Sequence, residues 1–134
     1  MRAGDSFSKW LGLELVELAP GRAVVRAVVR KDMLNALGTC HGGVTFAMAD
    51  SALGFAGNGR GKVAVSMEGN ISFTRPAREH DVLTLTAQEI SASNRLLVYS
   101  VSVVNQRGEV VAACRGTLFR LEADHFPAHE GGNP

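Results

Sequence analysis

The sequence predicts an α+β fold in which an antiparallel sheet of five to six strands wraps around one long central helix. Only one stretch of the 134 residues, from 38 to 61, is long enough and apolar enough on nearly all sides to form a buried helix. Much of the remaining chain alternates apolar and polar residues with a period of two, the pattern of half-buried strands. The connections after the helix are short, and short connections join antiparallel strands.

Two strands are expected before the helix. Residues 5 to 10 predict a short helical turn, and residues 12 to 18 and 22 to 30 predict a hairpin around the turn signal Ala19-Pro20-Gly21. One face of the second strand is apolar throughout: Ala23, Val25, Ala27 and Val29. This face should pack on the helix.

Four strands are expected after the helix. Residues 62 to 74 form a long strand, followed by strands at 82 to 90, 96 to 104 and 109 to 121. The alternation in the long strand predicts one apolar face, opposite a polar face that carries Ser66: Val63, Val65, Met67, Gly69, Ile71 and Phe73. Gly69 in mid-strand suggests a bulge or a close backbone approach.

Composition and charge narrow the class of protein. A chain of 134 residues with 46% hydrophobic and 20% charged residues suits a single domain spanning 1 to 134, with a disordered tail at 123 to 134. The net charge of +1 and scattered basic residues give no reason to expect nucleic acid as a partner. No segment approaches the ~20 apolar residues of a membrane span, and the first residues lack a signal core. We therefore expect a cytoplasmic protein with no membrane partner.

The two cysteines, Cys40 and Cys114, fit a reducing compartment and fall short of a metal motif, so no metal is predicted. Cys40 beside His41 suggests a nucleophile pair only weakly, because adjacent residues seldom direct their side chains at each other. His125 and His129 could bind metal but are treated as an incidental pair in the tail.

Chemically active groups concentrate in the central segment. Glycines at the helix start, Gly42 and Gly43, leave N–H groups approachable at the positive end of the helix dipole, where they could stabilise an oxyanion. The alternative is that these glycines only permit close helix–sheet packing. Asp50 lies among apolar neighbours, where an ionised carboxylate is costly. It is either a nucleophile or a base that activates water, or else it caps a backbone group or faces solvent at a rim.

The motifs of this segment resemble a known family. Thr39-Cys40-His41-Gly42-Gly43 and Ala49-Asp50-Ser51-Ala52, with Asn35 upstream and Phe73-Thr74-Arg75-Pro76 downstream, resemble the PaaI-type hotdog-fold thioesterases over about residues 10 to 121. The resemblance implies the hotdog fold and hydrolysis of acyl-coenzyme A. The typical substrates of the family are phenylacetyl-CoA and its hydroxylated relatives, which belong to phenylacetic acid degradation. The sequence does not decide whether this chain prefers aryl or medium-chain acyl groups. No cofactor is implied, because coenzyme A is part of the substrate.

The resemblance also implies residue roles. Asp50 matches the family's catalytic Asp, and Gly42 its oxyanion donor. Asn35 would hold the carbonyl or its own loop, or be a plain turn residue; His41 would orient the loop or the glycine backbone. Ser66 would position the attacking water, or be an ordinary strand residue.

Coenzyme A phosphates call for basic side chains. The candidates for the coenzyme moiety, each with the alternative of being a plain surface or strand residue, are Phe73, Arg75, Ser91, Arg95 and Arg120. Met48, Leu53 and Phe55 are candidates to shape an apolar acyl pocket.

Spacing within the helix predicts a dimer. Asp50 comes eight residues after Gly42, which at ~1.5 Å per residue is roughly 12 Å along a helix. Attack requires atoms about 3–3.5 Å apart, so one chain's Gly42 and Asp50 cannot serve the same carbonyl. Antiparallel helices from two subunits could, which predicts a homodimer with composite active sites. The resemblance also implies that two such dimers often pair into a homotetramer. The sequence does not decide between a dimer and a tetramer for this chain.

Two other functions are compatible with such a fold. A 3-hydroxyacyl-thioester dehydratase or hydratase would need a His poised for proton transfer in a different motif, which the sequence lacks. A non-catalytic acyl-CoA-binding module would have no need of Asp50.

Overall fold

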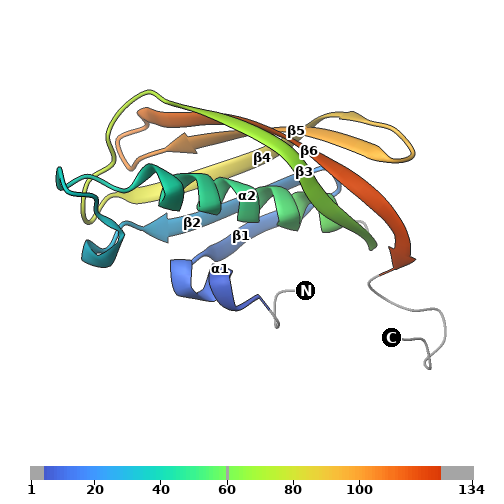
Figure 1. The fold of residues 1–134 in the computed structure, drawn as a ribbon, viewed down its shortest axis with the longest axis horizontal. Coiled ribbons are helices and arrows are strands. Elements are labelled where there is room, and N and C mark those ends of the chain that lie inside the picture. Colours follow the sequence, from blue (N-terminus) through green and yellow to red (C-terminus); the bar gives the residue numbers. More distant parts are fainter. Residues whose placement is uncertain (1–4, 60, 125–134) are drawn as a thin grey trace.

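The computed structural model describes residues 5 to 59 and 61 to 124. A single sheet wraps around the long helix (Figure 1). The elements run in the order α1 (Ser6–Leu11), β1 (Glu14–Ala19), β2 (Arg22–Val28), the 3-10 helix η2 (Lys31–Met33), α2 (Gly42–Asn58), β3 (Lys62–Phe73), β4 (Val82–Ala92), β5 (Leu96–Val104) and β6 (Val110–Asp124). The predicted α+β class is confirmed.

The sheet has six strands in the order β1-β2-β4-β5-β6-β3, and every neighbouring pair is antiparallel. All six strands contact α2. Helix α2 connects β2, which is second from one edge of the sheet, to β3, which pairs with β6 at the opposite edge (Figure 1). The chain therefore crosses one face of the sheet along α2, and β3 is an edge strand. The long edge strand and the helix therefore lie side by side, and the candidate site forms along them.

Helix α2 is shorter than the predicted segment of 38 to 61. His41 is its N-cap and the helix ends at Asn58. Small side chains at Ala49 and Ala52 are fully buried and let the sheet approach closely. The helix is not buried on every side, however. Residues spaced i, i+4, i+7 and i+11 form an exposed or half-buried stripe: Gly43, Ala47, Asp50 and Gly54.

The second strand follows its prediction. Ala23, Val25, Ala27 and Val29 are all at most 3% exposed, while Val28 is 48% exposed. The period of two is thus preserved from sequence to packing, except at Val24, which is buried at 8% exposed.

The long strand β3 departs from its prediction. Its pairing with β6 shifts register between Ser66 and Glu68, so Met67 is an extra residue at a bulge. Val65 and Met67 are exposed, at 46% and 58%, and Ser66 instead reaches the helix. The predicted single apolar face and the predicted polar orientation of Ser66 are therefore wrong, because an extra residue reverses the alternation.

Strand β6 continues to Asp124, which pairs with Lys62, so it enters the segment predicted as a tail. Residues 125 to 134, which include His125 and His129, lie outside the described residues. Within the described part of the chain, no helix has the length and apolar character needed to cross a membrane.

Candidate active site at the start and middle of α2

The first turn of α2 leaves one backbone donor open. The Gly43 N–H donates to His41 Nδ1 at 2.8 Å, and the Val44 and Thr45 N–H groups donate to the His41 carbonyl oxygen at 2.9 and 3.3 Å. Among the residues that the structure describes, the Gly42 N–H has no such partner. Gly42 is therefore the first-turn amide available to a carbonyl oxygen at the positive end of the helix.

His41 acts as a helix cap in this geometry. Its Nδ1 accepts a hydrogen bond, so the neutral ring carries its proton on Nε2. This contact supports the expectation that His41 orients the glycine backbone. The Cys40 thiol does not turn toward this ring but lies 3.5 Å from Thr45 Oγ1, and burial raises the pKa of that thiol. The geometry thus does not support a Cys40–His41 nucleophile pair.

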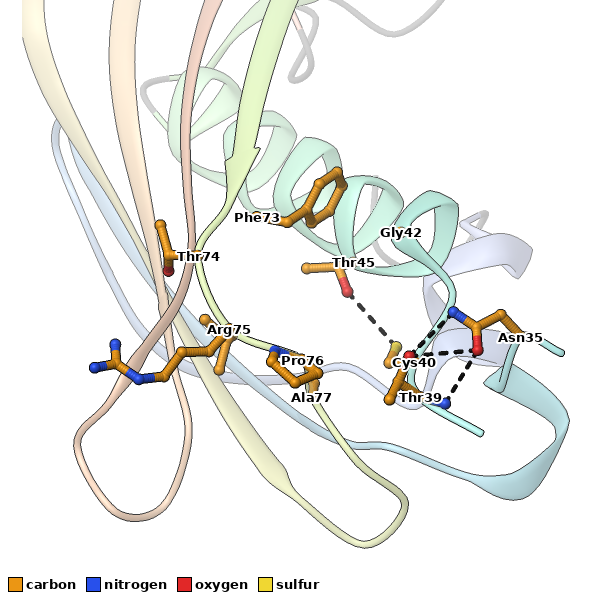
Figure 2. A pocket seen from close by; sticks show the side chains of 11 residues that line it. Asn35, Thr39, Cys40, Gly42, Thr45, Phe73, Thr74, Arg75, Pro76 and Ala77 are labelled. Atoms are coloured by element: carbon orange, nitrogen blue, oxygen red, sulfur yellow. Dashed lines mark hydrogen bonds between the residues drawn. The ribbon is translucent and has the colours of Figure 1, made fainter. Parts of the chain in front are cut away.

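A pocket opens beside Gly42, with a volume of about 330 Å³. Figure 2 shows its lining, which comprises Asn35, Thr39, Cys40, Gly42, Thr45, Phe73, Thr74, Arg75, Pro76, Ala77 and Val111. We call it the first pocket. It brings together four predicted site residues: Asn35, Gly42, Phe73 and Arg75.

Two of these residues shape the pocket around Gly42. The Phe73 ring lies against the glycine, since a Cβ at Gly42 would be 3.0 Å from Phe73 Cζ. The Asn35 side chain holds its own loop: Oδ1 accepts the Leu37 and Thr39 N–H groups at 2.9 and 3.1 Å. Of the roles expected for Asn35, the loop-holding role is the one these contacts support.

Asp50 lies in a different pocket, of about 370 Å³, between α2 and β3. We call it the second pocket; its lining comprises Gly43, Phe46, Ala47, Asp50, Leu53, Ser66, Glu68 and Gly69. Asp50 is exposed, so the sequence-based picture of an acid hidden inside a buried helix is corrected: the acid belongs to the exposed stripe. Ser66 Oγ donates a 2.7 Å hydrogen bond to Asp50 Oδ1.

Besides burial, the charge of Asp50 affects the pKa of one thiol on the sheet, that of Cys114 on β6. Burial, together with the nearby charges of Asp50 and Glu68, raises the pKa of the Cys114 thiol to about 11. Cys114 is therefore a protonated, buried packing residue on β6 at neutral pH.

The remaining coenzyme candidates lie apart from both pockets. Arg95 and Arg120 line a third hollow with Lys62, Asn94, Leu121 and Glu122, of about 350 Å³. Arg95 is ion-paired with Glu122 and donates to the Arg120 carbonyl oxygen at 3.3 Å. Ser91 lies on β4 opposite Val98 and lines none of these three pockets. One chain alone does not gather the predicted coenzyme residues into one site.

Sequence reasoning misplaced some pocket residues and missed others. Met48 is fully buried and Phe55 is 8% exposed, so both belong to the core, whereas Leu53 does line the second pocket. Phe46 was missed, although it stands one helical turn before Asp50 and so shares its face. Within residues 5 to 59 and 61 to 124, no three His, Cys, Asp or Glu side chains gather as a metal site would require.

The six-stranded antiparallel sheet wrapped around α2 is the hotdog fold that the sequence motifs imply, and comparison with known proteins specifies the family. Residues 37 to 112 match the thioesterase superfamily model. The acyl-coenzyme A thioesterase PaaI of Escherichia coli is 38% identical over 90% of this chain and 86% of its own length. The solved structure of the E. coli PaaI protein from the phenylacetic acid degradation operon matches with a TM-score of 0.91 and 37% identity, covering 92% of this chain and 90% of that one.

A Streptococcus mutans structure bound to acetyl-CoA matches with a TM-score of 0.79 and 26% identity, covering 81% of this chain and 88% of that one. The chain therefore belongs to the thioesterase superfamily, as a PaaI-type hotdog-fold thioesterase. The family resemblance drawn from the sequence motifs is confirmed.

Proposed function

We propose that this chain hydrolyses phenylacetyl-CoA, its hydroxylated forms, or related aryl and medium-chain acyl-CoA thioesters to the free acid and coenzyme A. The observation that carries the proposal is an open Gly42 N–H at the helix start, in the first pocket, together with a carboxylate, Asp50, in the second pocket. The relatives support the reaction class, since E. coli PaaI is an acyl-coenzyme A thioesterase.

In this mechanism the thioester carbonyl oxygen accepts a hydrogen bond from the Gly42 N–H. Asp50 removes a proton from water as the water oxygen bonds to the carbonyl carbon, and the negative charge moves to the oxygen held by Gly42. When the tetrahedral intermediate collapses, the C–S bond breaks, and the coenzyme A thiolate leaves and takes up the proton. In a covalent variant Asp50 itself attacks the carbonyl carbon, the coenzyme A thiolate leaves, and water then hydrolyses the mixed anhydride. Attack of that water at the Asp50 carbonyl carbon would place ¹⁸O from solvent in Asp50 during a single turnover, whereas direct attack by water on the thioester places it only in the product acid.

Two subunits would complete each site. The first pocket contains Gly42 and the second contains Asp50, and neither is lined by both residues. Antiparallel pairing of two α2 helices along the exposed stripe would bring Gly42 of one copy to Asp50 of the other. Gly43, Ala47 and Gly54 leave room for the close approach of helices. Residue 46 is midway between 42 and 50, so the two-fold axis would pass near Phe46 and Ala47.

The edge of the sheet supports the same assembly. Strand β3 is an edge strand beside α2, and Val65 and Met67 expose apolar side chains on it. A long, unpaired edge with exposed apolar residues is a natural surface for a second copy. The homotetramer and the cytoplasmic location stay predictions.

Coenzyme A would extend from the first pocket toward basic side chains. Arg75 lies at that pocket and points away from its Gly42 end (Figure 2). Arg95 and Arg120 offer further charge in the third hollow, where the phosphates would compete with Glu122 for Arg95.

Release of free thiol from a panel of acyl-CoA thioesters tests the proposal. We expect turnover by the native chain and a loss of about 10²–10⁴-fold in kcat for Asp50→Asn, the usual contribution of a general base. Asp32→Asn, an exposed acid paired with Arg30, is the matched control. Conversion of a 3-hydroxyacyl-CoA or an enoyl-CoA with the thioester bond intact, and no thiol release from any substrate, would indicate a dehydratase or hydratase. Binding without any conversion would indicate a non-catalytic module. Either result would refute the proposal.

A further inference from the structure

The lining of the second pocket suits only one arm of an acyl-CoA thioester. Phe46, Ala47 and Leu53 give it an apolar wall, and its charged groups are Asp50 and Glu68. Among the described residues that line it, none is a cation. Two carboxylates repel the coenzyme's phosphates, so this pocket fits the uncharged acyl group. The coenzyme arm follows the first pocket, whose lining includes Arg75 and no carboxylate.

The floor of the second pocket is made by a contact between helix and strand. A Cβ built on Gly69 of β3 would lie 3.3 Å from Phe46 Cζ and 3.5 Å from Phe46 Cε1. The Phe46 ring thus rests directly on the glycine backbone. Any side chain at position 69 would displace the ring, and both residues line the pocket.

The glycine is not needed for backbone conformation. The glycines with positive φ in the described chain are Gly12, Gly21, Gly38, Gly61 and Gly108. Gly69 is absent from this set, so an L-residue can adopt its conformation in the strand. What Gly69 supplies is space beneath Phe46.

We propose that Gly69 and Phe46 together determine which acyl groups this enzyme accepts, by setting the depth of the second pocket. This inference rests on the proposed thioesterase function and goes beyond it by assigning the acyl group to that pocket. A larger residue at position 69 displaces the Phe46 ring into the second pocket, which makes the pocket shallower and excludes bulky acyl groups. A smaller residue at 46 deepens the pocket again.

The experiment is a size-swap between the two positions. Purified native chain, Gly69→Val, Phe46→Ala and the double variant are compared by kcat/KM on acetyl-CoA, hexanoyl-CoA and phenylacetyl-CoA. In Gly69→Val we expect the phenylacetyl-to-acetyl ratio of kcat/KM to fall at least roughly tenfold, since one methylene in an apolar pocket is worth about 10–200-fold. In the double variant we expect the ratio to recover. Alanine at position 46 has no ring for the valine at position 69 to displace.

Ser72→Ala is the matched control, because Ser72 lies on the same strand, is exposed and lines neither pocket. An unchanged ratio in a folded Gly69→Val variant would overturn the proposal, as would an equal change in Ser72→Ala or a double variant without recovery. Rescue is a result that a purely structural role for Gly69 would not produce.

A failure of the thioesterase function can be told apart from a failure of this inference. If the native chain releases no thiol from any substrate, the same variants are compared by calorimetric binding of phenylacetyl-CoA and acetyl-CoA. We then expect the ratio of the two dissociation constants to follow the same loss and recovery. Equal ratios in all four proteins would refute the assignment of the acyl group to this pocket.

Discussion

Ser66 Oγ on β3 donates a 2.7 Å hydrogen bond to Asp50 Oδ1 on α2. The bond exists because the bulge at Met67 leaves Ser66 on the helix side of the strand. Within residues 5 to 59 and 61 to 124, the second carboxylate oxygen of Asp50 has no hydrogen-bond partner, so it is the oxygen available to water. Ser66 thus orients the acid through one oxygen and leaves the other free.

Replacing Ser66 by Ala should lower kcat by roughly tenfold with little change in KM, because a hydrogen bond to a charged group contributes about 1.5–3 kcal/mol. The fold should survive, since Ser66 is exposed. Steady-state thiol release measures both constants. Ser72→Ala, on the same strand and outside both pockets, should behave as the native chain. A rise in KM alone would show that Ser66 contacts substrate rather than the acid.

Replacing Gly42 by Pro removes the proposed oxyanion donor and adds a side chain beside Phe73. Gly42 is the first helical residue after the His41 cap, a position where Pro is well tolerated, and His41 has the extended φ and ψ of −61° and 134° that precede Pro. We expect kcat to fall about 10²–10³-fold, as on loss of one oxyanion donor. Thiol release measures the rate, and far-ultraviolet circular dichroism checks the helix.

Gly42→Ala distinguishes the effect of losing the N–H donor from the effect of filling the space beside Gly42. Alanine keeps the N–H but places a Cβ 3.0 Å from the Phe73 ring. Phe73 is 55% exposed and can turn aside, so this variant should retain most of its kcat. If Ala and Pro were equally damaging, crowding against Phe73 rather than the lost N–H would explain the effect.

The architecture could be predicted because its determinants are local. Alternation at Ala23, Val25 and Val29 marks a strand face, and one long, predominantly apolar segment marks the helix. The side of β3 occupied by Ser66 could not be predicted in the same way. Alternation assigns faces only while the register is unbroken, and a single bulged residue exchanges them without any strong signal in composition.

The site could be predicted only in part from the sequence, for a related reason. Gly42 and Asp50 stand in a recognisable motif on one helix, so their spacing could be used. Gly69 in mid-strand predicts a bulge or a close backbone approach, and the structure shows such an approach, by the Phe46 ring. That Phe46 is the partner is revealed only by the packing of helix on strand. The distribution of Arg75 and Arg95 over separate pockets likewise depends on tertiary structure.

Asp81 should make the stability of the fold sensitive to acid. The residue as a whole is 5% exposed, and this burial opposes the charge of its carboxylate. The hydrogen bonds from the Arg78 N–H and the Gln106 amide, together with the charges of Arg107 and Arg78, outweigh burial and lower the pKa of the carboxyl. A lowered folded-state pKa contributes stability that is present above the unfolded value of about 3.9 and is lost as pH falls through the folded value.

Urea unfolding of the native chain and of Asp81→Asn checks this acid dependence. We expect Asp81→Asn to be less stable at pH 7, and the difference between the two proteins to shrink as the pH is lowered below about 3.9. Glu79→Gln, two residues away, is the control for loss of a neighbouring charge. A difference that stays constant from pH 7 to pH 3 would show that Asp81 stabilises the turn through its shape and not its charge.

Mixing two inactive variants should restore activity if the sites are composite. In a homodimer of Asp50→Asn every site lacks the acid, and in one of Gly42→Pro every site lacks the donor. A heterodimer of the two has one site with both defects and one with neither. Random exchange of subunits makes about half of the dimers mixed, so about a quarter of the sites, and of the native activity, should return. Thiol release before and after co-refolding measures the recovery. If Gly42 and Asp50 of one chain served the same carbonyl, every site in the mixture would carry a defect and no activity would return.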